Sequence, residues 1–238
     1  MLFLGDSLSR RLTATLAEIL IHSHGVHEAV ERHTLESELG NGGHGSFKWP
    51  LNTTEYPTRC LHYAWAAYFA DLNTGLIRLS SNLKKSATAP FHYNTIMISA
   101  GVHDAQHTPA THPVLFTLAE TICQFAADNT ALTFIWRSAP PCSNAGTNKL
   151  ILETNLFMKE AIMGQHGGRC ATLKEDIGAI HILDAENILI PVAIGTNRIA
   201  GDSGEHFGLQ ARLALIQALI HILLTDEKSK TTLDYKKY

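Results

Sequence analysis

The sequence predicts an α/β protein in which a central parallel sheet lies between two layers of helices. Three observations support this three-layer α/β/α prediction. Short apolar runs alternate with longer stretches of helical spacing. Several of the runs end on a glycine or a polar residue, as strands do where they meet a turn. The 238 residues, 45% of them hydrophobic, are enough for one sizeable core.

The first half of the chain opens with the clearest strand-to-helix transition. An apolar run at residues 2–4 predicts a strand, and a helix is expected from about residue 8 to residue 22. A second strand is predicted at 26–30, followed by the glycine-rich loop at 40–45. Residues 60–70 are rich in aromatic residues and alanine, which favours a helix there.

The second half continues the alternation. In its first helix Leu115, Leu118, Ile122 and Phe125 recur at helical spacing. The expected elements are a strand at 95–100, a helix at 113–127, a strand at 131–136, a helix at 150–163, a strand at 179–184 and a helix at 209–224. With no repeat or linker visible, we predict one domain over residues 1–225 and a frayed polar tail over 226–238.

Charge and composition exclude several classes of protein. The net charge of −3 lacks the basic excess of a nucleic-acid-binding protein. The apolar stretch 209–224 is expected to be too short and too polar to span a membrane, because it contains Gln210, Arg212, Gln217 and His221. No signal peptide is visible and the chain starts almost inside a strand, so we expect any targeting segment to lie upstream.

The cysteines and histidines do not predict a metal or a cofactor. The four cysteines are widely spaced and lack a Cys-x-x-Cys pair; two disulfides are possible but not required. His103 and His107 lie four residues apart, as in helical zinc sites, but Pro109 would keep a helix there short. We therefore predict no metal ion, and a metal-dependent hydrolase is the minor alternative.

Ser7 is the candidate nucleophile. It follows an apolar strand and begins a helix, so its hydroxyl would project from the end of the sheet beside a helix N-terminus. His206, in a glycine-rich loop before the last predicted helix, is the candidate general base. Asp202 is the favoured group to orient it, and Glu205 is the alternative. The competing interpretation is a serine that only caps its helix.

Further candidate residues follow other strands or lie in loops. Active-site residues of open α/β sheets gather at the carboxyl ends of the strands. His103 and Asp104 come just after one strand, and Arg137 follows another. With Gly42 and Gly43, whose backbone amides can approach a ligand closely, we predict that they stabilise an oxyanion or bind substrate. An ordinary turn and a structural loop histidine are the alternatives.

These motifs resemble the SGNH/GDSL hydrolase superfamily, and more closely its PC-esterase branch, which includes trichome birefringence-like proteins and other glycan O-acetylation domains. The resemblance covers nearly the whole chain. Gly5-Asp6-Ser7 resembles the first block, the glycine loop the second, and Gly101-Val102-His103-Asp104 the third, with His103 where the superfamily usually has asparagine. Trp136-Arg137-Ser138-Ala139-Pro140 is similar to a PC-esterase segment, and Asn155 lies in the helix after it.

The fourth block of the superfamily is Asp-x-x-His, and here the chain departs from it. Position 203 is serine, and Asp202 lies four residues before His206. The loop would carry one extra residue, the acid would have moved, or the site would work as a Ser-His dyad.

The resemblance implies a flavodoxin-like fold and a serine-dependent acyl esterase without a cofactor. Its substrate would be an O-acyl, most simply O-acetyl, ester of a glycan or a similar small molecule. A glycan O-acetyltransferase with the same site, or a glycan- or protein-binding domain that kept the fold without catalysis, are the alternatives. The resemblance also implies the secretory pathway or Golgi lumen. We predict no nucleic-acid partner and make no prediction of oligomeric state.

Overall fold

A six-stranded sheet forms the centre of the computed structural model, which describes residues 1–23, 47–50, 60–85, 93–107, 109–142, 144–173, 180–189 and 208–234. The strand order is β2-β3-β1-β4-β5-β6. Five of these strands run parallel, and β2 pairs antiparallel with β3 at one edge. Their bounds are β1 Leu2–Gly5, β2 Phe47–Pro50, β3 Cys60–Trp65, β4 Thr95–Ser99, β5 Thr133–Arg137 and β6 Ile180–Leu183. The predicted fold class is confirmed.

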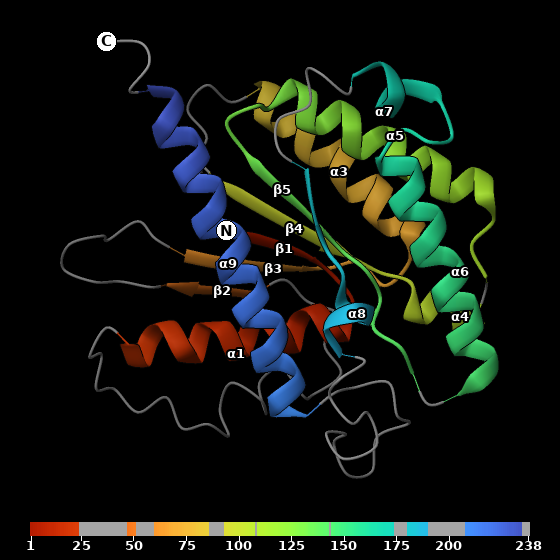
Figure 1. Ribbon diagram of the computed structural model, residues 1–238, viewed down its shortest axis with the longest axis horizontal. Coiled ribbons are helices and arrows are strands. Elements are labelled where there is room, and N and C mark those ends of the chain that lie inside the picture. The colour runs from red at the N-terminus through yellow and green to blue at the C-terminus, as the bar shows by residue number, and fades with distance from the viewer. Residues whose placement is uncertain are drawn as a thin grey trace.

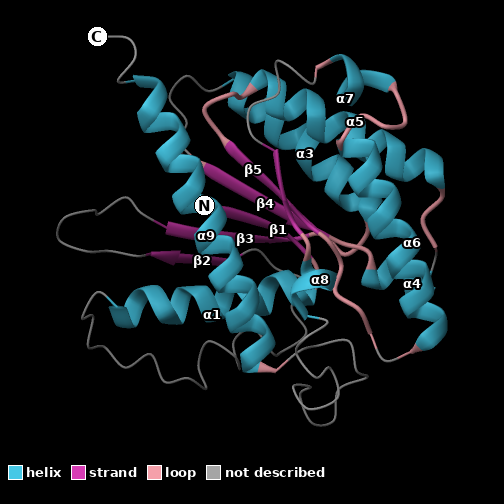
Figure 2. Ribbon diagram, viewed as in Figure 1, coloured by secondary structure: helices cyan, strands magenta, loops and turns pink. Residues whose placement is uncertain are grey.

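Helices cover both faces of the sheet (Figures 1 and 2). Helices α1 and α9, with the short α8, share a hydrophobic core with one face. Helices α3 and α5, with most of the buried residues of α6, share a second core with the other. The bounds are α1 Ser7–Ser23, α3 Phe69–Lys85, α4 Val102–His107, α5 His112–Asp128, α6 Ala145–Ile162, α7 Gly168–Thr172, α8 Ala185–Leu189 and α9 Leu209–Asp234.

The middle residues of the central strands are apolar because both faces of these strands are buried. In β1, Phe3 belongs to the core under α1 and α9, whereas Leu2 and Leu4 belong to the other core. In β4, Met97 and Ile98 divide between the two cores in the same way. Such strands read as unbroken hydrophobic runs rather than as alternating patterns, which is why the sequence revealed β1, β4 and β5.

The predicted helix at residues 60–70 is wrong. Residues 60–65 form β3, which lies beside β1, and α3 begins only at Phe69. Leu61 and Tyr63 are buried in the core under α1, while Ala64 packs against the opposite core. This two-residue alternation is that of a strand, and the aromatic and alanine content concealed it.

Helix α9 is longer than the sequence predicted. It runs from Leu209 to Asp234 and so includes residues that we expected in the polar tail. Asp226 is buried, and it accepts a hydrogen bond from Thr133 at the start of β5. In the part of the chain that the structure describes, Leu209–Asp226 is long and apolar enough to cross a membrane, with mean hydropathy 1.3. Its Ala211, Leu215 and Leu219 nevertheless lie in the core beside α1.

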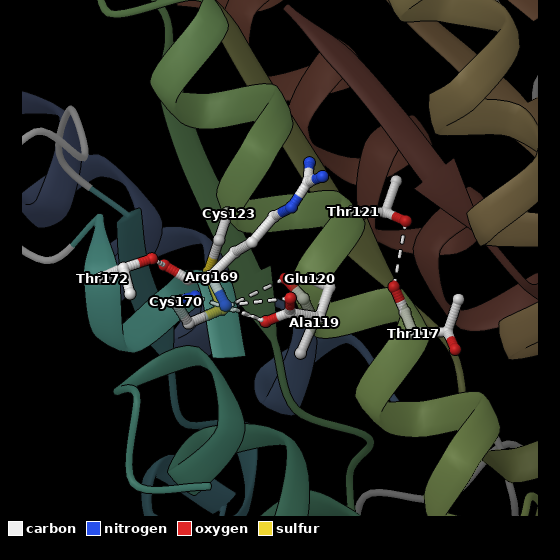
Figure 3. Close-up of a disulfide and its surroundings, with 8 residues drawn as sticks. All are labelled: Thr117, Ala119, Glu120, Thr121, Cys123, Arg169, Cys170 and Thr172. Carbon is white, nitrogen blue, oxygen red and sulfur yellow. Dashed lines mark hydrogen bonds between the residues drawn. A yellow bond between two sulfur atoms is a disulfide. The ribbon is translucent and has the colours of Figure 1, made fainter. Parts of the chain in front are cut away.

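A disulfide joins Cys123 of α5 to Cys170 of α7 (Figure 3). The same two helices are also joined by Glu120, whose carboxylate accepts hydrogen bonds from the backbone amides of Arg169 at 2.8 Å and Cys170 at 3.3 Å. The carboxylate therefore serves amides at the start of α7 that have no partner within the helix. Cys142 is buried and lies outside this disulfide.

Candidate active site

The site begins where β1 ends, at Gly5, and this position requires a glycine. A Cβ atom built on Gly5 would lie 2.2 Å from Ser9 Oγ and 2.6 Å from the carbonyl oxygen of Ser99 in β4. Backbone atoms of a central strand cannot withdraw without disturbing the sheet. The close approach lets α1 begin directly over the end of β1.

Asp6 holds the first turn of α1. It is 1% exposed, and its Oδ1 accepts hydrogen bonds from the backbone amides of Leu8 at 3.0 Å and Ser9 at 3.3 Å. Its carbonyl oxygen accepts the first intrahelical bond, from the amide of Arg10. This is the geometry of an N-cap, which satisfies amides that have no partner within the helix. Asp6 therefore fixes the path of the backbone from β1 into α1, and with it the position of Ser7.

Two distant residues hold the same turn. The hydroxyl of Tyr63, in β3, donates to the carbonyl oxygens of Gly5 at 2.9 Å and Asp6 at 3.1 Å. Arg137, at the end of β5, donates from its guanidinium to Ser9 Oγ at 3.1 Å and lies 3.9 Å from Asp6 Oδ1. Burial raises the pKa of Tyr63 and lowers the pKa of Arg137, while Asp6 opposes the second effect.

Ser7 is the first residue of α1 and is partly exposed, whereas Asp6 and Ser9 on either side of it are buried. The amides of Leu8 and Ser9 are directed to the Asp6 carboxylate. The Ser7 amide lies beside them at the N-terminus of α1. A 17-residue helix behind it adds the positive end of its dipole.

The next predicted site residues follow β4, which pairs with β1. Gly101 has φ 126°, a conformation that side chains rarely adopt, and the chain turns there into α4. His103 follows, half-buried, with its ring centroid 6.0 Å from those of Trp65 and Tyr68. Its predicted role in holding an oxyanion stays a prediction.

Asp104 faces the interior. Its carboxylate is buried and accepts a hydrogen bond from the backbone amide of Phe69, the first residue of α3, at 3.2 Å. Burial raises its pKa to about 6, although the bond from Phe69 acts in the opposite direction. The structure thus shows Asp104 joining α4 to the start of α3, and its predicted contact with substrate stays a prediction.

The end of β5 is held by side-chain bonds to the backbone. Asn155, buried in α6, accepts from the amide of Ala139 at 2.9 Å and donates to its carbonyl oxygen at 2.8 Å. Ser138 Oγ accepts from the amide of Ala185 at 2.8 Å, which joins β5 to α8. These bonds hold Ser138 and Ala139 directly after Arg137, so the backbone position at the end of β5 is fixed.

The remaining predicted site residues lie outside the described residues. They are Gly42, Gly43, Asp202, Glu205 and His206, and the strand expected at 26–30 lies there too. The described segment nearest to His206 begins at Gly208, whose carbonyl oxygen accepts from the amide of Arg212 in the first turn of α9. Within the described ranges there is no group of three or more His, Cys, Asp or Glu residues able to hold a metal ion.

Sequence reasoning missed Tyr63 and Ser9 as members of the site. The sequence favours a helix around Tyr63, and a helix there gives no indication that its hydroxyl donates to the carbonyl oxygen of Gly5. Ser9 contacts Arg137 across 128 positions of sequence, and no local pattern signals such a contact. The proposed role of Asp6 in holding the turn agrees with its hydrogen bonds.

Comparison with known proteins supports the fold. No protein-family model matches the chain, and no curated protein matches it. Among solved structures, a member of the lipolytic protein G-D-S-L family from Veillonella parvula is similar, with TM-score 0.52 and 15% identity. The match covers 93% of this chain and 96% of that one. At this identity the likeness shows a shared α/β fold.

Proposed function

We propose that the protein is a serine-dependent acyl esterase with Ser7 as its nucleophile. The observation that carries this proposal is the construction of the turn around Ser7. Buried Asp6, directly after β1, together with Tyr63 of β3 and Arg137 of β5, holds the turn, and Ser7 stays partly exposed. The lipolytic G-D-S-L protein of similar fold supports the same reaction class.

In the proposed reaction, Ser7 Oγ attacks the ester carbonyl carbon while His206 takes the hydroxyl proton. The negative charge on the carbonyl oxygen is stabilised by the Ser7 amide, by an amide of Gly42 or Gly43, and by His103. The bond to the alcohol then breaks, and His206 gives the proton to the leaving oxygen. Water, activated by the same histidine, releases the acid from Ser7. Asp202 orients the histidine.

We further propose that the ester is an O-acetyl group on a glycan or similar alcohol, as the resemblance to the PC-esterase branch implies. Glycan O-acetyl transfer is the alternative outcome of the same acyl-enzyme, with a sugar hydroxyl in place of water. The two differ in the rate of oligosaccharide acetylation against the rate of hydrolysis.

The test is covalent labelling by a fluorophosphonate probe, read as a mass shift on the peptide that carries Ser7. We expect Ser7 to be labelled, and expect Ser7→Ala and His206→Ala to abolish the label. Comparing Asp202→Asn with Glu205→Gln then shows which acid assists. Replacing the residue that orients His206 should lower the rate of ester hydrolysis about 10⁴-fold. Ser81→Ala, an exposed serine of α3, is the matched control and should label normally.

An unlabelled Ser7 in a folded sample would overturn the esterase proposal. The non-catalytic binding domain would then be the better account, and glycan binding that survives Ser7→Ala would be its signature.

A further inference from the structure

Three arginines line one small cavity beside the proposed nucleophile. The cavity is about 10 Å³ in volume and lies between α1, the segment after β5, and α9. Arg11, Arg137 and Arg212 line it, together with the apolar residues Leu8, Leu12, Pro140 and Leu215. Arginine stays charged at physiological pH, so three of them around one cavity make a local concentration of positive charge.

The cavity adjoins Ser7 through α1. Leu8 directly follows Ser7, and Arg11 lies four residues after it, which places Ser7 and Arg11 on the same side of the helix one turn apart. Arg212 lies in the first turn of α9, four residues from Gly208. The cavity therefore lies between the first turns of α1 and the first turns of α9.

The guanidinium of Arg137 is only partly compensated by its described contacts. Arg137 is 1% exposed and meets one carboxylate, that of Asp6, at 3.9 Å. Its Nε is buried and has no hydrogen-bond partner among the described residues. A buried donor without an acceptor is energetically unfavourable, and a bound anion would accept its hydrogen bond. The positive ends of α1 and α9 also favour an anion nearby.

The size of the cavity restricts what can enter it. A volume of about 10 Å³ admits the centre of about one water-sized group. One carboxylate or phosphate oxygen fits such a space, whereas a sugar ring does not. The apolar lining from Leu8, Leu12 and Leu215 lowers the local dielectric and strengthens the attraction between the guanidinium groups and an oxyanion.

We propose that this arginine cavity binds an anionic group, a carboxylate or phosphate oxyanion, carried by the ester substrate. The proposal rests on the proposed function, because it is the nearness to Ser7 that makes the bound anion part of a substrate. The substrate class is then an acyl ester of an acidic alcohol, such as a uronic acid or a sugar phosphate. Charge-assisted contacts from arginine orient the ester toward Ser7.

The test compares three mono-O-acetylated sugars that differ only in charge: methyl glucoside, methyl glucuronide and methyl glucoside 6-phosphate. We expect the kcat/KM of an anionic ester to exceed that of the neutral ester by about tenfold or more, since a hydrogen bond to a charged group contributes about 1.5–3 kcal/mol. Whether the glucuronide or the phosphate is preferred identifies the anion. Ratios near one for both would overturn the proposal.

Substitutions of the cavity arginines test whether the cavity causes the preference for anionic esters. Arg212→Gln and Arg11→Gln should each lower the ratio of anionic to neutral kcat/KM at least fivefold, and Arg212→Lys should restore part of it. Arg78→Gln, an exposed arginine of α3 on the opposite face, is the matched control and should keep the wild-type ratio. If Arg212→Gln does not fold, Arg11→Gln decides alone. An unchanged ratio in the folded variants would overturn the proposal.

Binding without turnover separates the two proposals. Methyl glucuronide or inorganic phosphate is titrated by calorimetry into wild-type protein and the Ser7→Ala and Arg212→Gln variants. Binding that survives Ser7→Ala and fails in Arg212→Gln supports the cavity even if Ser7 proves unreactive. Labelling of Ser7 together with turnover of all three esters at equal rates would leave the esterase proposal standing and remove this one.

Discussion

Helices α1 and α5, on opposite faces of the sheet, bury different kinds of side chain. On one face, α1 buries Ser9, Thr13 and Thr15 among its leucines, and Asp6 and Arg137 lie beneath it. On the other face, the buried residues of α5 are all apolar apart from Cys123, which is in the disulfide. Buried polar groups on the α1 side hold the turn at Ser7, whereas α5 supplies apolar packing and a covalent link.

This division suggests that stability and reactivity can be changed separately. Buried polar groups are costly unless each finds a partner, so the α1 face depends on a few specific hydrogen bonds. The stability of the α5 face depends on buried apolar area and on the disulfide, and both tolerate small shifts of the helices. Changes on the α5 face should therefore affect unfolding, and changes on the α1 face should affect the reactivity of Ser7 as well.

The largest expected change in the free energy of unfolding comes from the disulfide. Replacing both Cys123 and Cys170 by alanine opens a loop of 47 residues and should cost about 4 kcal/mol. Chemical denaturation measures the cost, and fluorophosphonate labelling of the remaining folded protein should proceed at the wild-type rate. A slowed label in fully folded protein would show that the two faces are not separable.

Gly5→Ala is the strongest test of the α1 face. The added methyl group would meet Ser9 Oγ and the Ser99 carbonyl, so we expect a loss of about 3 kcal/mol and labelling of Ser7 slowed about 100-fold. The control is Gly75→Ala in α3, where nothing lies within 4 Å of an added Cβ. That change should stabilise the helix by up to about 1 kcal/mol and leave labelling unchanged. Equal effects of the two changes would contradict the comparison.

Tyr63→Phe should have a smaller effect. It removes the donor shared by the carbonyl oxygens of Gly5 and Asp6 without changing the shape of the core, which should cost about 1–2 kcal/mol. Because the lost bonds hold the turn, labelling of Ser7 should also slow measurably. A variant with lowered stability and unchanged labelling would assign Tyr63 a structural role alone.

The smallest effect concerns pH. Because burial raises the pKa of Asp104 to about 6, folding favours its protonated form. Its contribution to stability is therefore complete below about pH 4, the usual pKa of an aspartate, and is lost as pH rises through about 6. Asp104→Asn keeps an acceptor for the Phe69 amide and removes the charge. The melting temperature of wild type relative to this variant should rise as pH falls from 7 to 5; a constant difference would contradict the assignment.

The sequence predicted the parts of the fold that depend on local patterns. β4 and β5 were recognised because strands buried on both faces are continuous apolar runs, and α5 because Leu115, Leu118 and Ile122 recur at helical spacing. β3 was missed because its two-residue alternation covers only six residues. Composition outweighed so short a period.

The candidate site was predictable only where a residue stands at the end of a recognised strand. Ser7, His103 and Arg137 met that criterion. The contact of Arg137 with Ser9 joins positions 128 residues apart, and the contact of Tyr63 with Gly5 joins positions 58 apart. Such contacts depend on strand order, which local periodicity does not contain. The predicted base His206 and acid Asp202 lie outside the described residues and stay predictions.

The position of β1 has a consequence for how the protein emerges from the ribosome. β1 is a central strand, and Leu2 pairs with His62 on one side and with Ile96 on the other. At ordinary rates of translation Ile96 is made on the order of 10 s after Leu2, and Arg137 follows later still. During synthesis the residues of the Ser7 turn are therefore present before the residues that hold them. β1 stays without its partners in the sheet until β3 and β4 have been made.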